Sequence, residues 1–371
     1  MSAALIDLVS KGVQDVYITG QPEVSFFRQN YKRYTNFSIR PERLDYIGTF
    51  GSNNEISIPI PNKGDLLSYV WLEAPNIGAT GDNSTGFFSN NAANFTEFSL
   101  WIGGQQVCTL DSLYIQAVHN LLYQSDSARS SCALLTNAFS ANARGGTNNL
   151  SDHYILPFFF SEDWTKCLPL VGIKFHEVEL KIKCRQGFTP SAAPKVYANY
   201  VFVDTDERTF FAEKDQEILF NQVQYQMATT SDTEFDLTYF NHPCKAVHLV
   251  SAMADGSNWN DSYTFSTASL YINGTTLFEE MSNVYHHTVV PQLHTTTLPP
   301  SGLQLTPTYT WPFCLSLNKM QPTGSLNFSR IDNAKLVVRN PVDVGNLLRV
   351  YAVNYNILRI KKGMAGVAFS N

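Results

Sequence analysis

The stretch Ser99–Gly104, with the sequence SLWIGG, is repeated as SLYING at Ser269–Gly274, 170 residues further along the chain. Both stretches read as a strand that runs into a two-residue turn. Gly-Gly and Asn-Gly are pairs that accept the positive φ angles of a tight β-hairpin. The repeat therefore predicts two hairpins at equivalent positions of two related units.

A second repeat supports this interpretation. Val196–Tyr200 (VYANY) corresponds to Val350–Tyr355 (VYAVNY), 154 residues later and with one residue inserted. The two repeats occur in the same order and at nearly the same separation, so the sequence predicts a tandem duplication of one all-β unit of about 160 residues. The joint falls near Asp204–Thr209, a polar stretch that we expect to form a solvated corner between the units.

The composition of the 371-residue chain favours β-structure and excludes one class of partner. Its 26 Lys and Arg and 32 Asp and Glu residues give a net charge of −6, which excludes a globally basic nucleic-acid binder. Charged residues make up only 16% of the chain, whereas aromatic residues make up 13%. This balance argues against disorder and against a helix-rich protein, and it indicates extensive buried or interface surface.

Alternating polar and apolar residues predict the individual strands. In Glu177–Cys184, charged residues alternate with Val, Leu, Ile and Cys, which is typical of a half-exposed antiparallel strand. In Glu55–Pro61 three isoleucines alternate with Ser and Pro, and the prolines favour an edge strand. We expect further strands at 38–50, 66–73, 97–109, 195–203, 218–227, 246–253, 268–278, 334–339 and 347–360.

Two segments have helical spacing. Met1–Gly12 predicts a short amphipathic helix, and it lacks the features of a secretory signal. Apolar residues at helical spacing follow Asp111, which is a suitable N-cap, up to Gln124. The segment Ser125–Ser151 is rich in Ser, Asn, Ala and Gly and predicts a long loop. No apolar stretch reaches the length of a transmembrane helix.

A unit of about 160 residues, with many short strands and one long loop, is more typical of a jelly roll than of an immunoglobulin-like sandwich, which needs only about 100 residues. The sequence therefore predicts an all-β protein of two tandem eight-stranded jelly rolls with short loop helices. We expect an N-terminal segment at 1–24, the first jelly roll at 25–208 and the second at 209–371.

The chain also resembles a known family, the major capsid proteins of large nucleocytoplasmic DNA viruses, and particularly those of the phycodnaviruses. The resemblance begins near residue 13 and continues in the family's order to the C-terminus. Four long stretches carry it, namely Asp15–Pro22 (DVYITGQP), Tyr31–Phe37 (YKRYTNF), Gln321–Asn333 (QPTGSLNFSRIDN) and Tyr351–Ile360 (YAVNYNILRI). Shorter matches lie at 25–28, 64–66, 168–170, 176–178, 204–208 and 363–366.

The resemblance implies a structural role in the virion and no turnover. Family members form homotrimers whose six jelly rolls make a pseudo-hexagonal capsomer, and neighbouring capsomers tile an icosahedral shell around an internal membrane. The implied partners are sister copies, neighbouring capsomers, minor capsid proteins and the membrane, with no sequence-specific nucleic acid and with assembly in the host cytoplasm. Relatives often carry longer loops at the positions of 255–266 and 340–345, so the outer shape of this chain is expected to differ.

Five basic residues near the N-terminus, interleaved with aromatic rings, are the candidate contact residues: Arg28, Lys32, Arg33, Arg40 and Arg43. Cations between rings can bind phosphates and bases. The alternative is that the rings are core or interface anchors and the cations pair with neighbours such as Glu42 and Asp45. We favour this alternative over nucleic-acid binding. Because relatives place this region toward the inside of the shell, the resemblance implies an inner-face contact with minor capsid proteins or membrane.

The sequence predicts no catalytic, cofactor or metal site. His286, His287 and His294 have no HExxH or carboxylate at ligand spacing, and His176 reads as a strand residue. The six cysteines form no CxxC motif and are expected to be free thiols. A carbohydrate-binding or hydrolytic β-sandwich is the alternative function, and it would need two carboxylates that converge on a cleft.

Seven Asn-x-Ser/Thr sequons occur in a chain rich in these residues. Synthesis in the cytoplasm would keep them from secretory glycosylation. Asn83, in a Gly-containing loop, is the candidate for modification by other enzymes, whereas Asn273 lies in a predicted tight turn.

Overall fold

The computed structural model describes residues 12–75, 95–123, 138–139, 151–190, 193–252, 263–295, 308–342 and 347–370. The chain divides into an N-terminal unit, Met1–Asn36, and a larger unit, Phe37–Asn371. Among its described residues the N-terminal unit has one short helix, α2 (Val16–Thr19), and no strand. The helix expected at Met1–Gly12 lies outside the described residues except for Gly12.

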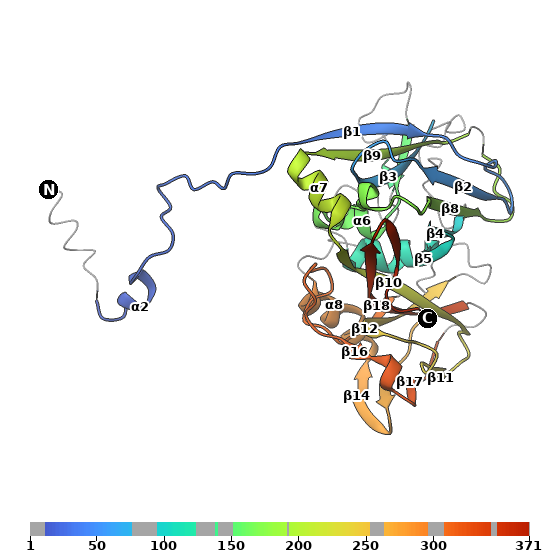
Figure 1. Ribbon diagram of the computed structural model, residues 1–371. Coiled ribbons are helices and arrows are strands. Elements are labelled where there is room, and N and C mark those ends of the chain that lie inside the picture. Colours follow the sequence, from blue (N-terminus) through green and yellow to red (C-terminus); the bar gives the residue numbers. More distant parts are fainter. Residues whose placement is uncertain are drawn as a thin grey trace. The chain divides into compact units, whose positions relative to one another are not determined.

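The first half of the larger unit is built from two antiparallel sheets (Figure 1). One sheet has the strand order β1-β9-β3-β7-β6, and the other has the order β2-β8-β4-β5. The strands are β1 (Phe37–Leu44), β2 (Glu55–Ile60), β3 (Leu66–Pro75), β4 (Phe95–Ile102), β5 (Gln105–Asp111), β6 (Ala138–Phe139), β7 (Ser151–Ile155), β8 (Val178–Cys184) and β9 (Lys195–Val203). The predicted edge strand Glu55–Pro61 is confirmed, because β2 lies at the end of its sheet.

The second half repeats this arrangement with the orders β10-β18-β12-β15 and β11-β17-β13-β14. Two short strands are additional, since β16 pairs with β12 and β19 pairs with β18. The strands are β10 (Gln216–Thr229), β11 (Glu234–Asp236), β12 (Pro243–Ala252), β13 (Thr267–Ile272), β14 (Thr275–Ser282), β15 (Thr308–Pro312), β16 (Leu326–Asn327), β17 (Ala334–Arg339), β18 (Leu347–Lys361) and β19 (Met364–Val367).

The two halves correspond strand by strand. In each, the first strand lies beside the last long strand, which in turn lies beside the third, and the second strand opens the other sheet. This order is that of a jelly roll. The predicted all-β fold of two tandem jelly rolls is therefore confirmed. The boundaries at 24 and 208 stay predictions: β1 begins only at Phe37, and a helix, α7 (Thr205–Glu213), spans the second boundary.

The repeated hairpins have the turn geometry that their sequences predict. Gly103 and Gly104 between β4 and β5 have φ angles of 57° and 78°, and Asn273 and Gly274 between β13 and β14 have 47° and 80°. The Asn273 side-chain oxygen also accepts hydrogen bonds from the backbone N–H groups of Asp332 and Asn333, at 3.2 and 3.1 Å. Asn273 is thus a structural turn residue, as expected.

A helix follows the hairpin in each roll. In the first roll it comprises α4 (Ser112–Tyr114) and the π-helix η1 (Ile115–Tyr123), which confirms the helix predicted after Asp111. In the second roll it comprises η5 (Tyr285–Val289) and α8 (Val290–His294). The remaining short helices are α6 (Phe159–Glu162), η3 (Trp164–Lys166), η4 (Leu170–Gly172) and η7 (Phe328–Arg330). None of the described helices has the length and hydropathy that crossing a bilayer requires.

Two predictions about these segments need correction. Asp111 occupies the N-cap position, but its side chain makes no capping hydrogen bond because it is engaged with β18 instead. The predicted loop 125–151 contains the short strand β6 at 138–139, because these residues pair with β7. The rest of that loop, up to residue 150, lies outside the described residues.

Strands β12 and β18, in the middle of the sheet β10-β18-β12-β15, are largely buried on both faces. The inner face of the sheet, with Val350 and Leu249, belongs to the core between the two sheets of the second roll. Its outer face, with Tyr351 and Val250, belongs to the core cluster that also contains the interior of the first roll. Burial on both faces of β12 and β18 means that the two rolls share a continuous apolar boundary, in which the charged groups described next are enclosed.

Candidate functional site

A buried ion pair crosses the boundary between the two jelly rolls. Asp111, at the end of β5, accepts hydrogen bonds from the guanidinium of Arg349 and from the hydroxyl of Tyr351, both on β18. Only 7% of the Asp111 side chain and 10% of the Arg349 side chain are exposed. Burial disfavours the charged guanidinium, but the Asp111 carboxylate and Tyr351 outweigh burial and raise the pKa of Arg349. The pair ties the first hairpin to the second roll.

A second buried cation, Lys245 on β12, lies in the same boundary. Its ammonium group is 5.2 Å from the ring centroid of Tyr123 on η1 and 5.8 Å from that of Tyr355 on β18, and only 1% of the residue is exposed. Burial lowers the pKa of Lys245 to about 8. The boundary therefore holds an ammonium group against the rings of two tyrosines.

Neutral polar groups complete this part of the boundary. The Tyr123 hydroxyl is 2.8 Å from Nε2 of His248, and Nδ1 of His248 is 3.0 Å from Oγ1 of Thr310. Burial, aided by the charge of Lys245, lowers the pKa of His248 to about 3. His248 is thus neutral near pH 7, and its two ring nitrogens link a helix of the first roll to a sheet of the second.

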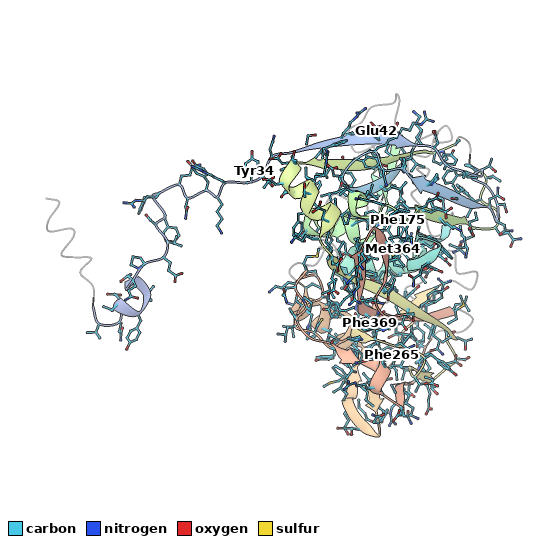
Figure 2. All side chains as sticks on the ribbon, viewed as in Figure 1. Tyr34, Glu42, Phe175, Phe265, Met364 and Phe369 are labelled. Atoms are coloured by element: carbon cyan, nitrogen blue, oxygen red, sulfur yellow. The ribbon has the colours of Figure 1, made fainter. Side chains whose placement is uncertain are left out.

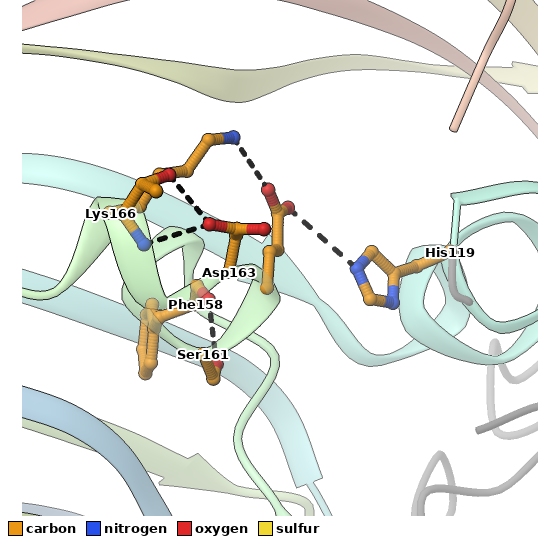
Figure 3. A network of polar contacts seen from close by, with 7 residues as sticks. His119, Phe158, Ser161, Asp163 and Lys166 are labelled. Atoms are coloured by element: carbon orange, nitrogen blue, oxygen red, sulfur yellow. Dashed lines mark hydrogen bonds and ion pairs between the residues drawn. The ribbon is translucent and has the colours of Figure 1, made fainter. Parts of the chain in front are cut away.

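A network of polar contacts holds the short helices α6 and η3 (Figure 3). Nζ of Lys166 donates to Glu162 at 2.9 Å, and Nε2 of His119 lies 4.0 Å from the other Glu162 oxygen. Asp163 accepts hydrogen bonds from the backbone N–H and the hydroxyl of Thr165, which lower the pKa of Asp163. Each charged group is held by its own neighbours, so the arrangement is typical of a structural ion-pair network.

The predicted basic residues are divided between the two units. Arg28, Lys32 and Arg33 belong to the N-terminal unit, whereas Arg40 and Arg43 lie on β1 of the larger unit. The five cations thus belong to two units that are described separately. Arg40 forms an ion pair with Glu42 at 2.7 Å, which is the neighbour pairing that the alternative interpretation of the sequence predicted.

The aromatic residues among these cations are exposed. In the N-terminal unit the rings of Phe26 and Phe27 are the most exposed, at 93% and 99%, and Tyr31 and Tyr34 are exposed as well. Rings that project in this way do not belong to a core of the unit that carries them. Of the two roles that the sequence left open for them, core residue or interface anchor, the exposure favours the anchor.

Two of the histidines considered in the sequence, His176 and His286, form hydrogen bonds with the protein backbone. His286 is buried, with Nδ1 3.1 Å from the Thr310 carbonyl oxygen and its ring 4.5 Å from that of Trp311, and burial lowers the pKa of His286 to about 4. His176 bonds to the backbone of Ala365 through Nδ1. The residues that the structure describes contain no group of three or more His, Cys, Asp or Glu side chains that could hold a metal ion.

The thiols and the candidate glycosylation site can be placed only in part. Five cysteines are buried free thiols: Cys108, Cys167, Cys184, Cys244 and Cys314. Burial raises the pKa of each, for example to about 11 for Cys167 and about 12 for Cys244. Cys132 and Asn83 both lie outside the described residues.

The loop before β8 contacts the hairpin of β18 and β19, which joins the rolls at a second place. The backbone N–H of Phe175 donates to the Gly363 carbonyl oxygen at 2.9 Å, next to the contact between His176 and Ala365. Phe175 and Met364, labelled in Figure 2, are exposed beside this contact. Gly363 has a φ of 82°, and a Cβ atom there would lie 2.7 Å from the Phe175 ring. The turn thus requires glycine for two reasons.

Sequence reasoning missed the charged residues of the roll boundary. Arg349 was included in the strand predicted at 347–360 without a role, and Lys245 lies just before the strand predicted at 246–253. Each stands in an apolar stretch, LLRVYAV and PCKAVHL respectively. A single cation inside a strand that is apolar on both faces is the signal that could have identified them, because such a charge needs a partner from another element.

Comparisons with known proteins agree with this architecture. The family described as "Major capsid protein N-terminus" matches residues 25–204, and the family described as "Large eukaryotic DNA virus major capsid protein" matches residues 207–366. The chain is 31% identical to the major capsid protein of Pyramimonas orientalis virus and 27% identical to that of Paramecium bursaria Chlorella virus 1. Both alignments cover 100% of this chain and 100% of the relative.

A solved structure of the PBCV-1 virus capsid is similar in fold, with a TM-score of 0.75 and 24% sequence identity over 94% of this chain and 100% of the other. The fold and the duplicated topology therefore define a double jelly-roll protein. The 31% identity to the Pyramimonas orientalis virus protein, over the full length of both chains, identifies the family more specifically than the fold does. The chain belongs to the major capsid proteins of large nucleocytoplasmic DNA viruses and is a structural component of the virion capsid.

Proposed function

We propose that the chain assembles as a homotrimer whose six jelly rolls form a pseudo-hexagonal capsomer, and that such capsomers tile an icosahedral shell in the host cytoplasm. The observation that carries the proposal is the presence of two jelly rolls of equivalent topology in one chain. Three copies then supply six similar rolls. Each contact is heterologous, and a threefold rotation closes the ring.

The exposed apolar residues of the larger unit support assembly. Leu293 and Leu315 on the second roll are 70% and 77% exposed, and Trp164 on the first is 60% exposed. Obligate interfaces are more apolar than ordinary protein surface, so such side chains fit contacts between copies.

We further propose that the role is structural and involves no catalysis. The buried Asp111 and Arg349 of the roll boundary are engaged with each other, and the relatives named above are capsid proteins. A carbohydrate-binding or hydrolytic β-sandwich remains the competing class. Binding or cleavage of glycans by the purified protein would favour it.

Size-exclusion chromatography with light scattering tests the trimer. We expect the purified chain to elute as a species of three times 41.6 kDa, because one closed ring satisfies every heterologous contact. Dilution over a wide range of concentration should leave this mass unchanged if the interface is obligate. A monomer at high concentration would contradict the proposal, and so would an open series of larger species.

The N-terminal unit is proposed to contact minor capsid proteins or the internal membrane through Arg28, Lys32 and Arg33. Its exposed cations and rings support this role. Reversing the three charges to Glu is expected to leave the capsomer intact and to reduce particle yield or to make particle stability less dependent on salt. Unchanged yield and salt dependence would refute the contact. Arg40 and Arg43, which lie on β1, are not part of this proposal.

A further inference from the structure

A row of four residues crosses the outer face of the sheet β10-β18-β12-β15. Register partners define the row as Tyr225, Tyr351, His248 and Thr310. The helix of the first roll covers it, since the Tyr114 ring is 5.4 Å from that of Tyr351 and the Tyr123 hydroxyl is 2.8 Å from His248. Tyr351 and His248 are 0% exposed as a result.

The first roll has an equivalent row on its sheet β1-β9-β3-β7. The repeat VYA places Tyr197 at the position of Tyr351. The register of the sheet then defines the row as Arg43, Tyr197, Trp71 and Ile155, so that Trp71 corresponds to His248. Val196 and Ala198 on either side of Tyr197 belong to the core, which confirms that Tyr197 faces outward.

This second row is an aromatic surface that is only partly covered. The rings of Trp71 and Tyr197 are stacked, with their centroids 5.3 Å apart and an angle of 16° between them. Tyr69 and Trp164 continue the surface. The ring centroid of Tyr69 is 5.5 Å from that of Trp71, and the ring centroid of Trp164 is 6.2 Å from that of Tyr69. Tyr351 and His248 in the second roll are fully buried, whereas their counterparts Tyr197 and Trp71 are half-buried.

The second roll also has an equivalent of the covering helix. Tyr114 lies three residues after β5 ends, at Asp111, and Tyr285 lies three residues after β14 ends, at Ser282. The helix pair η5–α8 is therefore the counterpart of α4–η1. One side of it packs on its own roll through His286 and Trp311.

The other side of η5–α8 is apolar and exposed. Val284 is 58% exposed and Leu293 is 70% exposed, and Val289 is exposed as well. Among the described residues, the exposed side of this helix pair thus lacks a sheet, and the outer face of the sheet β1-β9-β3-β7 is covered by helical residues only in part, through Trp164 of η3. Within the chain the contact between these two kinds of surface already exists once, between α4–η1 and the sheet of the second roll.

We infer that the outer face of the sheet β1-β9-β3-β7 is the docking surface for the helix pair η5–α8 of a second copy of this chain, with Trp71 and Tyr197 of one copy against Tyr285 and Leu293 of the next. Within a chain, a helix of the first roll packs on a sheet of the second roll. The proposed contact packs a helix of the second roll on a sheet of the first roll of the next copy, so one type of contact closes a ring of six rolls. The inference rests on the proposed homotrimer and identifies the two surfaces through which its subunits contact each other.

The chemistry of the two contacts differs in one respect. The sequence repeat places Lys195 of the first roll at the position of Arg349 in the second. Asp111 ends the second strand of the hairpin in the first roll, and Ser282 ends the equivalent strand in the second. The buried ion pair within the chain therefore has no counterpart between copies. The contact between copies depends on aromatic and aliphatic surface instead, which suits an interface that forms after each chain has folded.

Two single substitutions on opposite surfaces test this inference. Tyr197→Asp removes the sheet surface and Leu293→Asp removes the helix surface, and each is expected to change the light-scattering mass from three chains to one. Leu293 is 70% exposed, so its substitution leaves the chain's own packing intact even if Tyr197→Asp disturbs it. Tyr239→Asp, at a tyrosine that is 72% exposed in the turn after β11, is the matched control and should remain trimeric.

Mixing the two variants gives a sharper result. The Tyr197→Asp chain keeps its helix surface and the Leu293→Asp chain keeps its sheet surface, so together they can form one contact and no ring. We expect analytical ultracentrifugation to show a 1:1 heterodimer in the mixture and monomers in each variant alone. Far-UV circular dichroism equal to that of the wild type establishes that each variant is folded.

The outcomes separate this inference from the proposed function. A wild-type trimer that persists in both variants would overturn the docking surfaces and leave the homotrimer standing, whereas a monomeric wild type would overturn both. Binding of an oligosaccharide that Tyr197→Asp abolishes while the trimer persists would assign the aromatic row to a glycan and would also overturn the inference. Titration of the wild type and this variant with oligosaccharides, followed by tryptophan fluorescence, decides that case.

Discussion

Replacing Asp111 with alanine is expected to lower the free energy of unfolding by about 3–5 kcal/mol, because the substitution leaves the Arg349 guanidinium buried without its counter-ion. Tyr351 loses the acceptor of its hydroxyl at the same time. Urea denaturation followed by circular dichroism measures the change. The double variant Asp111→Leu with Arg349→Met is expected to recover most of the loss, since apolar side chains of similar volume need no partner at a buried boundary.

An exposed ion pair on the same strand provides the control. Arg359 on β18 contacts Glu217 at 2.9 Å, with 55% of each side chain exposed. Arg359→Ala is expected to change the free energy of unfolding by no more than about 1 kcal/mol, because water solvates the charges that remain. Equal effects of Asp111→Ala and Arg359→Ala would show that the buried pair does not hold the two rolls together.

Replacing Lys245 with methionine is expected to stabilise the protein near pH 7. The folded chain lowers the pKa of Lys245 from 10.5 to about 8, so burial of the protonated amine costs about 3 kcal/mol at about 1.4 kcal/mol per pKa unit. Methionine has a similar length and needs no proton or partner. Urea denaturation at pH 7 should therefore show a gain of up to about 3 kcal/mol, whereas Lys361→Met, at an exposed position, should show almost none.

The same cation predicts a dependence of stability on pH. Between pH 8 and 10.5 the unfolded chain keeps the Lys245 proton and the folded chain releases it. The unfolded state then binds more protons, so the contribution of Lys245 to stability rises with pH across this window and is constant below it. The difference between wild type and Lys245→Met should shrink over the same window. A constant difference would show that the amine is not buried in its charged form.

The parts of the fold that depend on local chemistry could be predicted from the sequence. The Gly-Gly and Asn-Gly turns restrict φ by themselves, and the alternation in Glu177–Cys184 fixes which residues of β8 face inward. Two other elements were missed, for different reasons. The helix α7 begins after Asp204, whose side chain accepts the Thr205 N–H, and the acidic first turn that follows is an ordinary helix start. The short strand β15 was missed because its pairing with β12 decides it.

The candidate site could not be predicted in the same way, because its partners are distant in sequence. Asp111 was read as a helix cap, which is what an acid before an apolar helical stretch indicates locally. Its true partner, Arg349, lies 238 residues away and reaches it only after both rolls have formed. Likewise, periodicity cannot show that the outer face of β18 is buried, since that depends on the helix of another roll. The duplication, by contrast, was visible in sequence and is what relates Tyr197 to Tyr351.

The position of β18 in the middle of its sheet has a consequence for synthesis on the ribosome. The strand is inserted between β10 and β12, so that sheet stays open until residue 361 has been translated. Until then the nascent chain presents two unpaired strand edges and the uncovered rings of η1, which are surfaces prone to aggregation. Pairings this distant in sequence also form slowly. We therefore expect a subunit to become competent for assembly only after its last long strand has been translated.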